Sequence, residues 1–143
     1  MNPLPISDPV ALRHRRQLHK CRCCEIALAN TPPNVRVVQV RRSLTGKAYL
    51  KQGILAGPKP FTRKALYIFL HECAHFVLHG SCHKPSYVKE KEEQWAHAKM
   101  REAGMPVPRA MTRRAKAYVR RKIRSAIRHG AKRIDPSAQR YAK

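Results

Sequence analysis

Two histidines and a glutamate in the middle of the chain have the types and spacing of a metal-dependent hydrolytic site. His71, Glu72 and His75 form the pattern H-E-x-x-H. Residues i and i+4 share one face of an α-helix, so both histidines can point at one metal ion. Glu72 then lies beside the ion, where it can take a proton from a water molecule. The pattern predicts a zinc site with hydrolytic chemistry, provided that the segment is helical.

The residues around the motif predict one buried helix over residues 61–79. Thr62 is a suitable N-cap, Lys59-Pro60 ends any preceding helix, and Gly80 is a suitable stop. The segment is apolar on nearly every side, as in the central helix of a domain. Two histidines and an acid on such a helix cost free energy unless a partner satisfies them. The alternative to a metal ion is a pair of hydrogen-bonded core histidines.

A catalytic zinc ion usually has three protein ligands and one open position, so the motif leaves one ligand to be found. The extended pattern with a third histidine, H-E-x-x-H-x-x-G-x-x-H, is absent, because positions 78 and 81 are Leu and Ser. His79 lies one turn further along, but three ligands from one straight helix cannot surround an ion tetrahedrally. We therefore expect the third ligand on the next helix or the loop before it. The candidates are Glu90, Glu92, Glu93, His83 and His97.

The motif and the segment after it resemble the ImmA/IrrE-type metallopeptidases, which are compact gluzincins. The second helix of that family has the form E-x-x-A and is followed by an M-P pair, and Glu93, Ala96, Met105 and Pro106 match this pattern. The resemblance covers roughly residues 45–108. It implies that Glu93 is the third zinc ligand and that the fold is zincin-like. It also implies peptide-bond hydrolysis on a narrow substrate, such as a DNA-associated regulatory protein.

The chain is strongly basic. Its 143 residues include 31 Lys and Arg against 8 Asp and Glu, which gives a formal net charge of +23. A charge of this size attracts polyanions, most often nucleic acid, and the alternative is a solvated basic surface without a partner. Five of the 8 acids lie between residues 72 and 102. The motif therefore has the negative surroundings that a cation site needs.

The apolar segments and the cysteines indicate where in the cell the protein is expected. The N-terminus has no apolar run of signal-peptide length, and no stretch reaches the ~18 apolar residues of a membrane span. The five cysteines form no regular framework, which favours reduced thiols in the cytoplasm. Cys21, Cys23 and Cys24, with His19, offer a second metal site as an alternative to free thiols. Their C-x-C spacing is less specific than paired C-x-x-C.

Strand and helix patterns flank the motif helix. Residues 35–41 and 47–55 have strand patterns on either side of the turn Thr45-Gly46, and we expect them to pair as a hairpin. One helix is expected over residues 88–104, and another from Thr112 as N-cap to about residue 129.

These elements predict a small α+β, zincin-like domain. A short β-hairpin or sheet packs on the buried motif helix and the helix after it, and a basic helix follows. Three parts are expected along the chain. They are a basic, cysteine-containing N-terminal arm with a short helix (1–33), the metallopeptidase core (34–108), and a basic C-terminal helix and tail (109–143).

Two functions are compatible with these features. The first is a zinc metallopeptidase acting on a protein or peptide, in which Glu72 is catalytic and His71, His75 and Glu93 bind Zn²⁺. The second is a non-catalytic DNA-binding protein that keeps its zinc as a structural element. Tyr87, His83 and Tyr118 are candidates to stabilise an oxyanion, and the sequence does not select one of them.

The C-terminal helix carries the densest positive charge of the chain. Its apolar stripe should pack on the domain, so its other face should present a basic ridge. We expect this ridge to contact phosphate backbones without sequence preference. The residues predicted to do so are Arg113, Arg114, Arg120, Arg121, Lys122 and Arg124.

Overall fold

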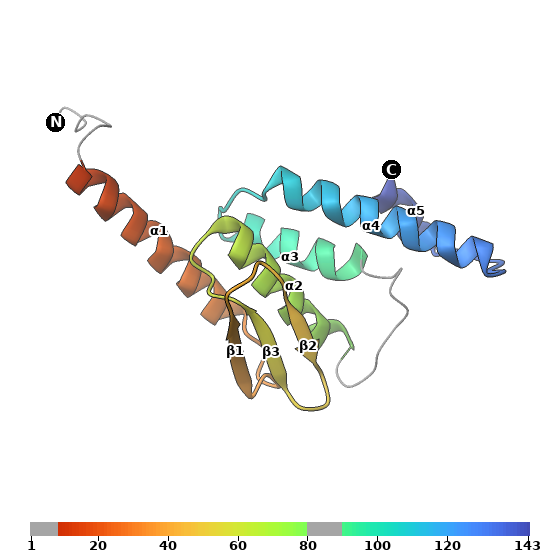
Figure 1. Cartoon of the computed structure of the whole chain (residues 1–143), viewed down its shortest axis with the longest axis horizontal. Coiled ribbons are helices and arrows are strands. Elements are labelled where there is room, and N and C mark those ends of the chain that lie inside the picture. The colour runs from red at the N-terminus through yellow and green to blue at the C-terminus, as the bar shows by residue number, and fades with distance from the viewer. Residues whose placement is uncertain (1–8, 80–89) are drawn as a thin grey trace.

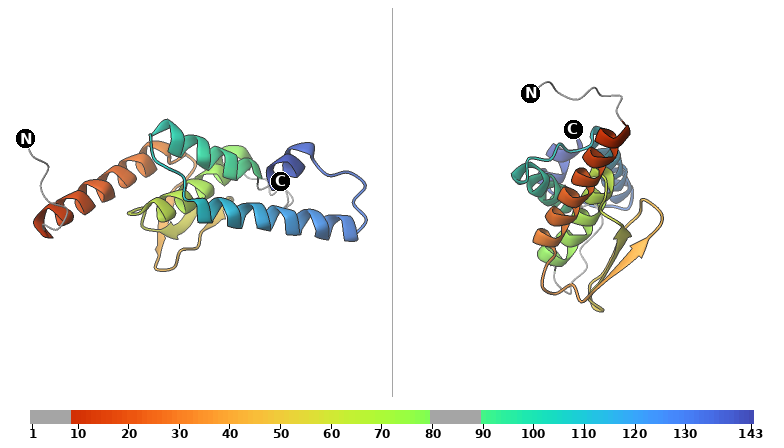
Figure 2. Two further views of the ribbon diagram at one scale, coloured as in Figure 1. Left: turned by 90° about the horizontal axis from the view of Figure 1, so that it is seen from above. Right: turned by 90° about the vertical axis from the view of Figure 1, so that its left-hand side faces the viewer.

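The computed structural model describes residues 9–79 and 90–143. These residues form an α+β fold of five helices and a small three-stranded sheet (Figure 1). The elements in chain order are α1 Pro9–Asn30, β1 Val37–Arg41, β2 Lys47–Tyr49, β3 Ile54–Pro58, α2 Arg63–His79, α3 Glu90–Glu102, α4 Arg109–Arg128 and α5 Pro136–Ala142. The sheet covers one side of the helices, as Figure 2 (right) shows.

The strands pair differently from the predicted hairpin. The sheet has the order β1-β3-β2, with β1 parallel to β3 and β2 antiparallel to β3, so the segments on either side of Thr45-Gly46 are not neighbours. The physical reason is a turn inside the predicted second strand, where Gly53 has φ +69. A glycine adopts this backbone conformation without the steric cost of a Cβ. The chain therefore folds back after β2, and β1 adds to the other edge of β3.

The helix α2 is the central element, as its apolar sequence predicts. Thr62 is confirmed as its N-cap, because the Thr62 hydroxyl accepts a hydrogen bond of 3.2 Å from the Ala65 amide. The sheet packs on one side of α2, and α1 and α3 pack on its other sides. Leu66, Leu70 and Cys73 are fully buried in the core around it. The helix is therefore held on all sides, which fixes the direction of its polar side chains.

The end of α1 belongs to the same core. Cys23, Ile26 and Ala27 are buried there with α2, although the sequence suggested a separate N-terminal arm. Arg22 ties this helix to the end of α3 through a hydrogen bond of 2.5 Å from its Nη2 to the carbonyl oxygen of Ala103. The other end of α1 extends away from the rest of the molecule (Figures 1 and 2).

Glycines end the two helices after the motif helix, as predicted. Gly104 follows α3 with φ +70 and Gly130 follows α4 with φ +89, both in the left-handed region that glycine tolerates. The predicted N-cap of α4 is wrong. The helix begins at Arg109 after Pro108, and Thr112 lies in its first turn, where its hydroxyl donates to the Pro108 carbonyl oxygen at 3.5 Å. Pro108 occupies the N-cap position with extended backbone, and no side chain caps this end of the helix.

The partner of the apolar stripe on α4 is partly a helix that the sequence did not predict. Val119 is fully buried against Ala138 and Ala142 of α5, and Ile123 packs on this cluster. At the start of α4, Met111 packs on the main core. As a result α4 is attached at both of these places and lies alongside the central helices. No helix in the described part of the chain is long and apolar enough to cross a membrane.

Candidate metal and hydrolytic site

The motif side chains lie on one face of α2, opposite the start of α3. The rings of His71 and His75 are in edge contact, with centroids 5.0 Å apart. One ligand atom each of His71, Glu72 and His75 lies within 4.8 Å of the other two, which is close enough to share a metal ion. Glu72 is only 6% exposed although its side chain ends in a polar carboxyl group. A buried acid beside two histidines indicates a polar site built into the core.

Glu93 reaches this group from α3. Its Oε1 lies 2.6 Å from Nδ1 of His71, and the side chain is buried. Burial raises the pKa of Glu93 from 4.5 to about 8, because the charged carboxylate loses its hydration. Its second oxygen, Oε2, is buried without a hydrogen-bond partner within the described residues. Such an orphaned carboxylate oxygen is a group that a bound cation would satisfy.

A second compact group of ligands lies one turn further along α2. One ligand atom each of His75, His79 and Glu92 lies within 4.8 Å of the others. His79 Nε2 is in close contact with Glu92 Oε1, and His75 Nδ1 is 3.4 Å from the same oxygen. A carboxylate on one ring nitrogen is the usual device that orients a metal-binding histidine. Glu92 is therefore placed to fix the ring of His75 while Glu93 faces His71.

The predicted zinc ligands meet in pairs, and Glu93 belongs to neither compact group of ligand atoms found among the described residues. His71 contacts both His75 and Glu93, whereas His75 Nδ1 lies 3.4 Å from Oε1 of Glu92.

Among the other candidates, His97 shares a hydrogen bond of 3.2 Å with the Tyr67 hydroxyl. Burial lowers the pKa of His97, with further contributions from Arg101 and Lys116. His83, Tyr87 and the side chain of Glu90 lie outside the described residues.

A pocket of about 500 Å³ gives access to the site. His71, Glu72 and Glu93 lie on one side of it, and the loop before β2 contributes Thr45 and Gly46. The helix α4 also lines the pocket, through Met111, Arg114, Ala115, Ala117, Tyr118, Val119 and Arg121. The site is therefore open to a ligand and is bounded by α2, α3, α4 and the loop before β2.

Gly46 is in close contact with Glu72. A Cβ added at Gly46 would lie 2.6 Å from both Cγ and Oε1 of Glu72, nearer than real Cβ atoms come to other heavy atoms. Only a glycine therefore leaves room for the Glu72 carboxylate in its present position. In the sequence, Thr45-Gly46 indicated only a turn, and this contact depends on packing between residues 26 positions apart.

Two further features of the site were missed although the sequence contains a signal for them. The series His71, His75 and His79 repeats every four residues, so a second polar group one turn along α2 could have been expected. The spacing of Arg114, Tyr118 and Arg121 is i, i+4 and i+7, which places them on one face of a helix. That this face lines the pocket could not be read from the spacing.

The cysteines of α1 do not assemble into a metal site among the described residues. Cys21 is exposed, Cys23 lies 3.6 Å from His19 Nε2 through its Sγ, and Cys24 donates to the Pro60 carbonyl oxygen at 3.9 Å. The thiols thus face different partners. The two compact ligand groups found in the described part of the chain contain none of these cysteines.

The six residues predicted to bind nucleic acid divide over two faces of α4. Arg114 and Arg121 line the pocket, whereas Arg113, Arg120 and Arg124 are exposed and are absent from its lining. Their spacing of i, i+7 and i+11 forms a row along the helix. Lys122 is half-buried, and its Nζ lies 5.4 Å from the centroid of the Tyr118 ring.

In comparisons with known proteins, the chain matches no family model, no curated protein and no solved structure. Inference about its function therefore rests on the residues of the site and their geometry.

Proposed function

We propose that the protein is a zinc-dependent metallopeptidase with a zincin-like arrangement of its motif helix. The observation that carries the proposal is the meeting of the H-E-x-x-H face of α2 with Glu93 of α3 beside an open pocket. His71, His75 and Glu93 would hold the ion, a donor set of two imidazoles and one carboxylate that suits catalytic zinc. The orphaned Oε2 of Glu93 fits this role.

The chemistry then divides between the ion and the chain. Zinc, when bound, supplies a Lewis acid that polarises a peptide carbonyl and makes water a good nucleophile near neutral pH. Glu72 is the general base, because its carboxylate borders the pocket beside the histidines. It takes one proton from the attacking water, and as the C–N bond breaks it passes that proton to the leaving nitrogen. The products are a carboxylate and an amine.

Several contacts hold Glu72 and the histidines in place for this role. The helix α2 is buried around the motif, so the backbone of the site is rigid. Glu92 contacts His75 and His79, and Gly46 closes over Glu72. Positioning of this kind matters because a displacement of about 1 Å can cost on the order of 10²-fold in rate.

The replacement Glu72→Gln tests the proposal. The variant keeps the shape of the side chain but cannot accept a proton, so hydrolysis should fall by about 10²–10⁴-fold. The assay is cleavage of a mixed library of unstructured peptides, with products read by mass spectrometry and zinc content measured in parallel. Glu102→Gln is the matched control, because Glu102 is exposed and pairs only with Lys99 among the described residues.

The proposal predicts that Glu72→Gln retains zinc and loses cleavage while Glu102→Gln retains both. A wild-type protein that holds zinc and cleaves no peptide would contradict the catalytic role. Such a result would favour the second candidate, a non-catalytic DNA-binding protein with a structural metal. The exposed row of Arg113, Arg120 and Arg124 on α4 is the observation that supports this alternative.

A further inference from the structure

The pocket over the motif carries two positive charges that the hydrolytic mechanism does not use. Arg114 and Arg121 line it from α4, and both side chains are exposed to solvent. They lie two helical turns apart on the same face, about 10 Å along the helix axis. Tyr118 lies between them and also lines the pocket.

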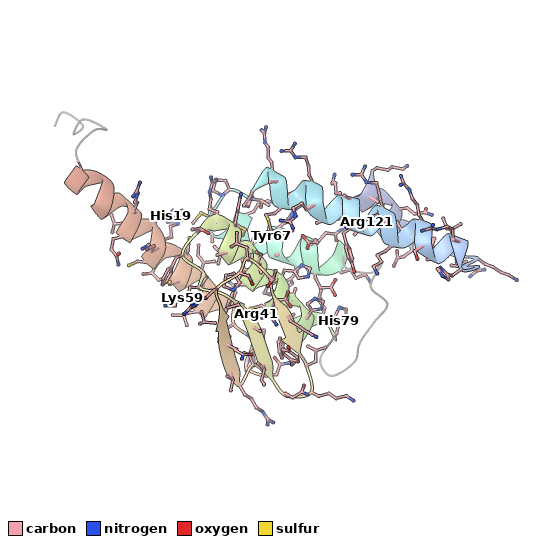
Figure 3. All side chains as sticks on the ribbon, in the orientation of Figure 1. His19, Arg41, Lys59, Tyr67, His79 and Arg121 are labelled. Carbon is pink, nitrogen blue, oxygen red and sulfur yellow. The ribbon has the colours of Figure 1, made fainter. Side chains whose placement is uncertain are left out.

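The two arginines are placed for a ligand rather than for a structural contact. Within the described residues, neither guanidinium forms an ion pair with a carboxylate. The Arg121 guanidinium carbon lies 5.9 Å from the centroid of the Tyr118 ring, a cation–π contact that restricts the side chain without neutralising its charge. Figure 3 shows Arg121 on α4 and Tyr67 on the neighbouring α2.

Without a bound ion, the two acids and the two arginines that line the pocket have equal and opposite formal charges. Among the described residues that line it, the acids are Glu72 and Glu93. A bound divalent ion would balance these two carboxylates, and the two guanidinium groups would remain uncompensated. Guanidinium groups bind carboxylates through paired, charge-assisted hydrogen bonds.

We propose that Arg114 and Arg121 form a specificity subsite that selects peptide substrates with an acidic side chain near the scissile bond. This inference rests on the proposed metallopeptidase function and names its substrate class. A peptide is favoured over nucleic acid because the two arginines line the same pocket as Glu72, the residue that would act on a peptide bond. Arg113 and Arg120, which have the same spacing as the pocket pair, are not in the pocket lining.

The test compares two double variants that remove the same charge. R114Q/R121Q changes the pocket pair, and R113Q/R120Q changes the matched pair one residue earlier on α4. Each protein is assayed on peptides that differ only by Glu or Gln at positions flanking the cleaved bond. The wild type should prefer Glu, and R114Q/R121Q should lower the Glu-to-Gln ratio of kcat/KM by roughly tenfold, as for the loss of a hydrogen bond to a charged group. R113Q/R120Q should keep the ratio.

A binding measurement separates this inference from the proposed activity. The same labelled Glu and Gln peptides are titrated into Glu72→Gln protein, with and without R114Q/R121Q, and a single-stranded oligonucleotide is titrated as a further probe. The subsite predicts that the pocket pair controls the preference for the Glu peptide even if no protein in the series cleaves. R114K/R121K, which keeps the charge, should retain part of the preference, and the circular dichroism spectrum of each variant shows whether it folds.

Three outcomes would overturn the inference. Equal losses of preference in R114Q/R121Q and R113Q/R120Q would mean that the general charge of the chain attracts the peptide. A loss of oligonucleotide binding alone in R114Q/R121Q would assign the pocket arginines to nucleic acid. Cleavage without any preference for Glu would remove the subsite and leave the metallopeptidase proposal standing.

Discussion

Glu92 and Glu93 are adjacent in sequence and contact different histidines. Glu93 contacts His71, and Glu92 contacts His75 and His79. Adjacent residues on a helix point about 100° apart, so both can reach α2 only because α3 packs closely against it. The family resemblance implies that Glu93 is the third zinc ligand. Because the two glutamates contact different histidines, replacing each one separately can show which of them binds zinc.

Replacing each acid by glutamine should separate their roles. Glu93→Gln should weaken zinc binding by more than the 10–100-fold typical of outer hydrogen-bonding partners, because a direct ligand is removed. Glu92→Gln should retain zinc at saturating metal, although the loss of the buried carboxylate contact with His79 should lower the melting temperature. Zinc content and thermal unfolding of the two variants give the answer. Retention of zinc by Glu93→Gln and its loss from Glu92→Gln would move the site one turn along α2.

Gly46 offers a test of how closely Glu72 must be positioned. In Gly46→Ala the new methyl group would lie 2.6 Å from Glu72 Oε1, so the carboxylate must move. Cleavage should fall on the order of 10²-fold while zinc content and fold persist.

Gly57→Ala is the control for that substitution, because a Cβ at Gly57 meets only Leu55 Cδ2, at 3.9 Å. Equal activity in the two alanine variants would show that the contact between Gly46 and Glu72 has no role in the reaction.

At the scale of elements, most helices could be predicted from local sequence signals. The strand order and the pocket depend on contacts between residues that are distant in the sequence. Thr62, Gly104 and Gly130 act through their own backbone neighbourhoods, so the sequence predicts where helices start and stop. Sheet order was predicted wrongly because a turn at Gly53 interrupts a segment that reads as one strand.

The short helix α5 and the contribution of α4 to the pocket could not be predicted from the sequence. The helix contacts α4 through small side chains such as Ala138 and Ala142, which give little periodic signal. Glu93 could be named from the family resemblance, whereas the approach of α4 to Glu72 across the pocket depends on packing between distant segments.

The start of α2 should depend measurably on its cap. Thr62→Ala removes the hydroxyl that accepts from the Ala65 amide and should lower the free energy of unfolding by about 1 kcal/mol. Thr112→Ala is a suitable comparison, because that hydroxyl lies inside the first turn of α4 and caps no helix. Chemical denaturation measures both, and equal effects would mean that Thr62 contributes no specific capping energy.

On the scale of the whole molecule, the positive charge has two separable locations. Arg114 and Arg121 line the pocket, and Arg113, Arg120 and Arg124 form the exposed row on α4. A formal net charge of +23 supports contact with polyanions in addition to a peptide substrate. The row is the better candidate for phosphate backbones because its residues lie outside the lining of the pocket that contains Glu72.

Binding to duplex DNA should weaken as salt increases, because the release of cations condensed on the DNA drives association. Replacing Arg113, Arg120 and Arg124 by glutamine should reduce the slope of log K against log salt by about 0.9 for each phosphate that the variant no longer neutralises. Titration of labelled duplex at several salt concentrations measures the slope. An unchanged slope in the triple variant would exclude the row from the interface.

We propose that His71, His75 and Glu93 hold the zinc ion. X-ray absorption at the zinc edge identifies the atoms bound to the ion and can therefore show whether they do. The measurement uses wild-type, full-length protein loaded with one equivalent of zinc. We expect only nitrogen and oxygen ligands, at about 2.0–2.2 Å from the ion, with the signature of two imidazoles. Sulfur at about 2.3 Å would show that the cysteines bind the ion, and failure to retain zinc would contradict the site altogether.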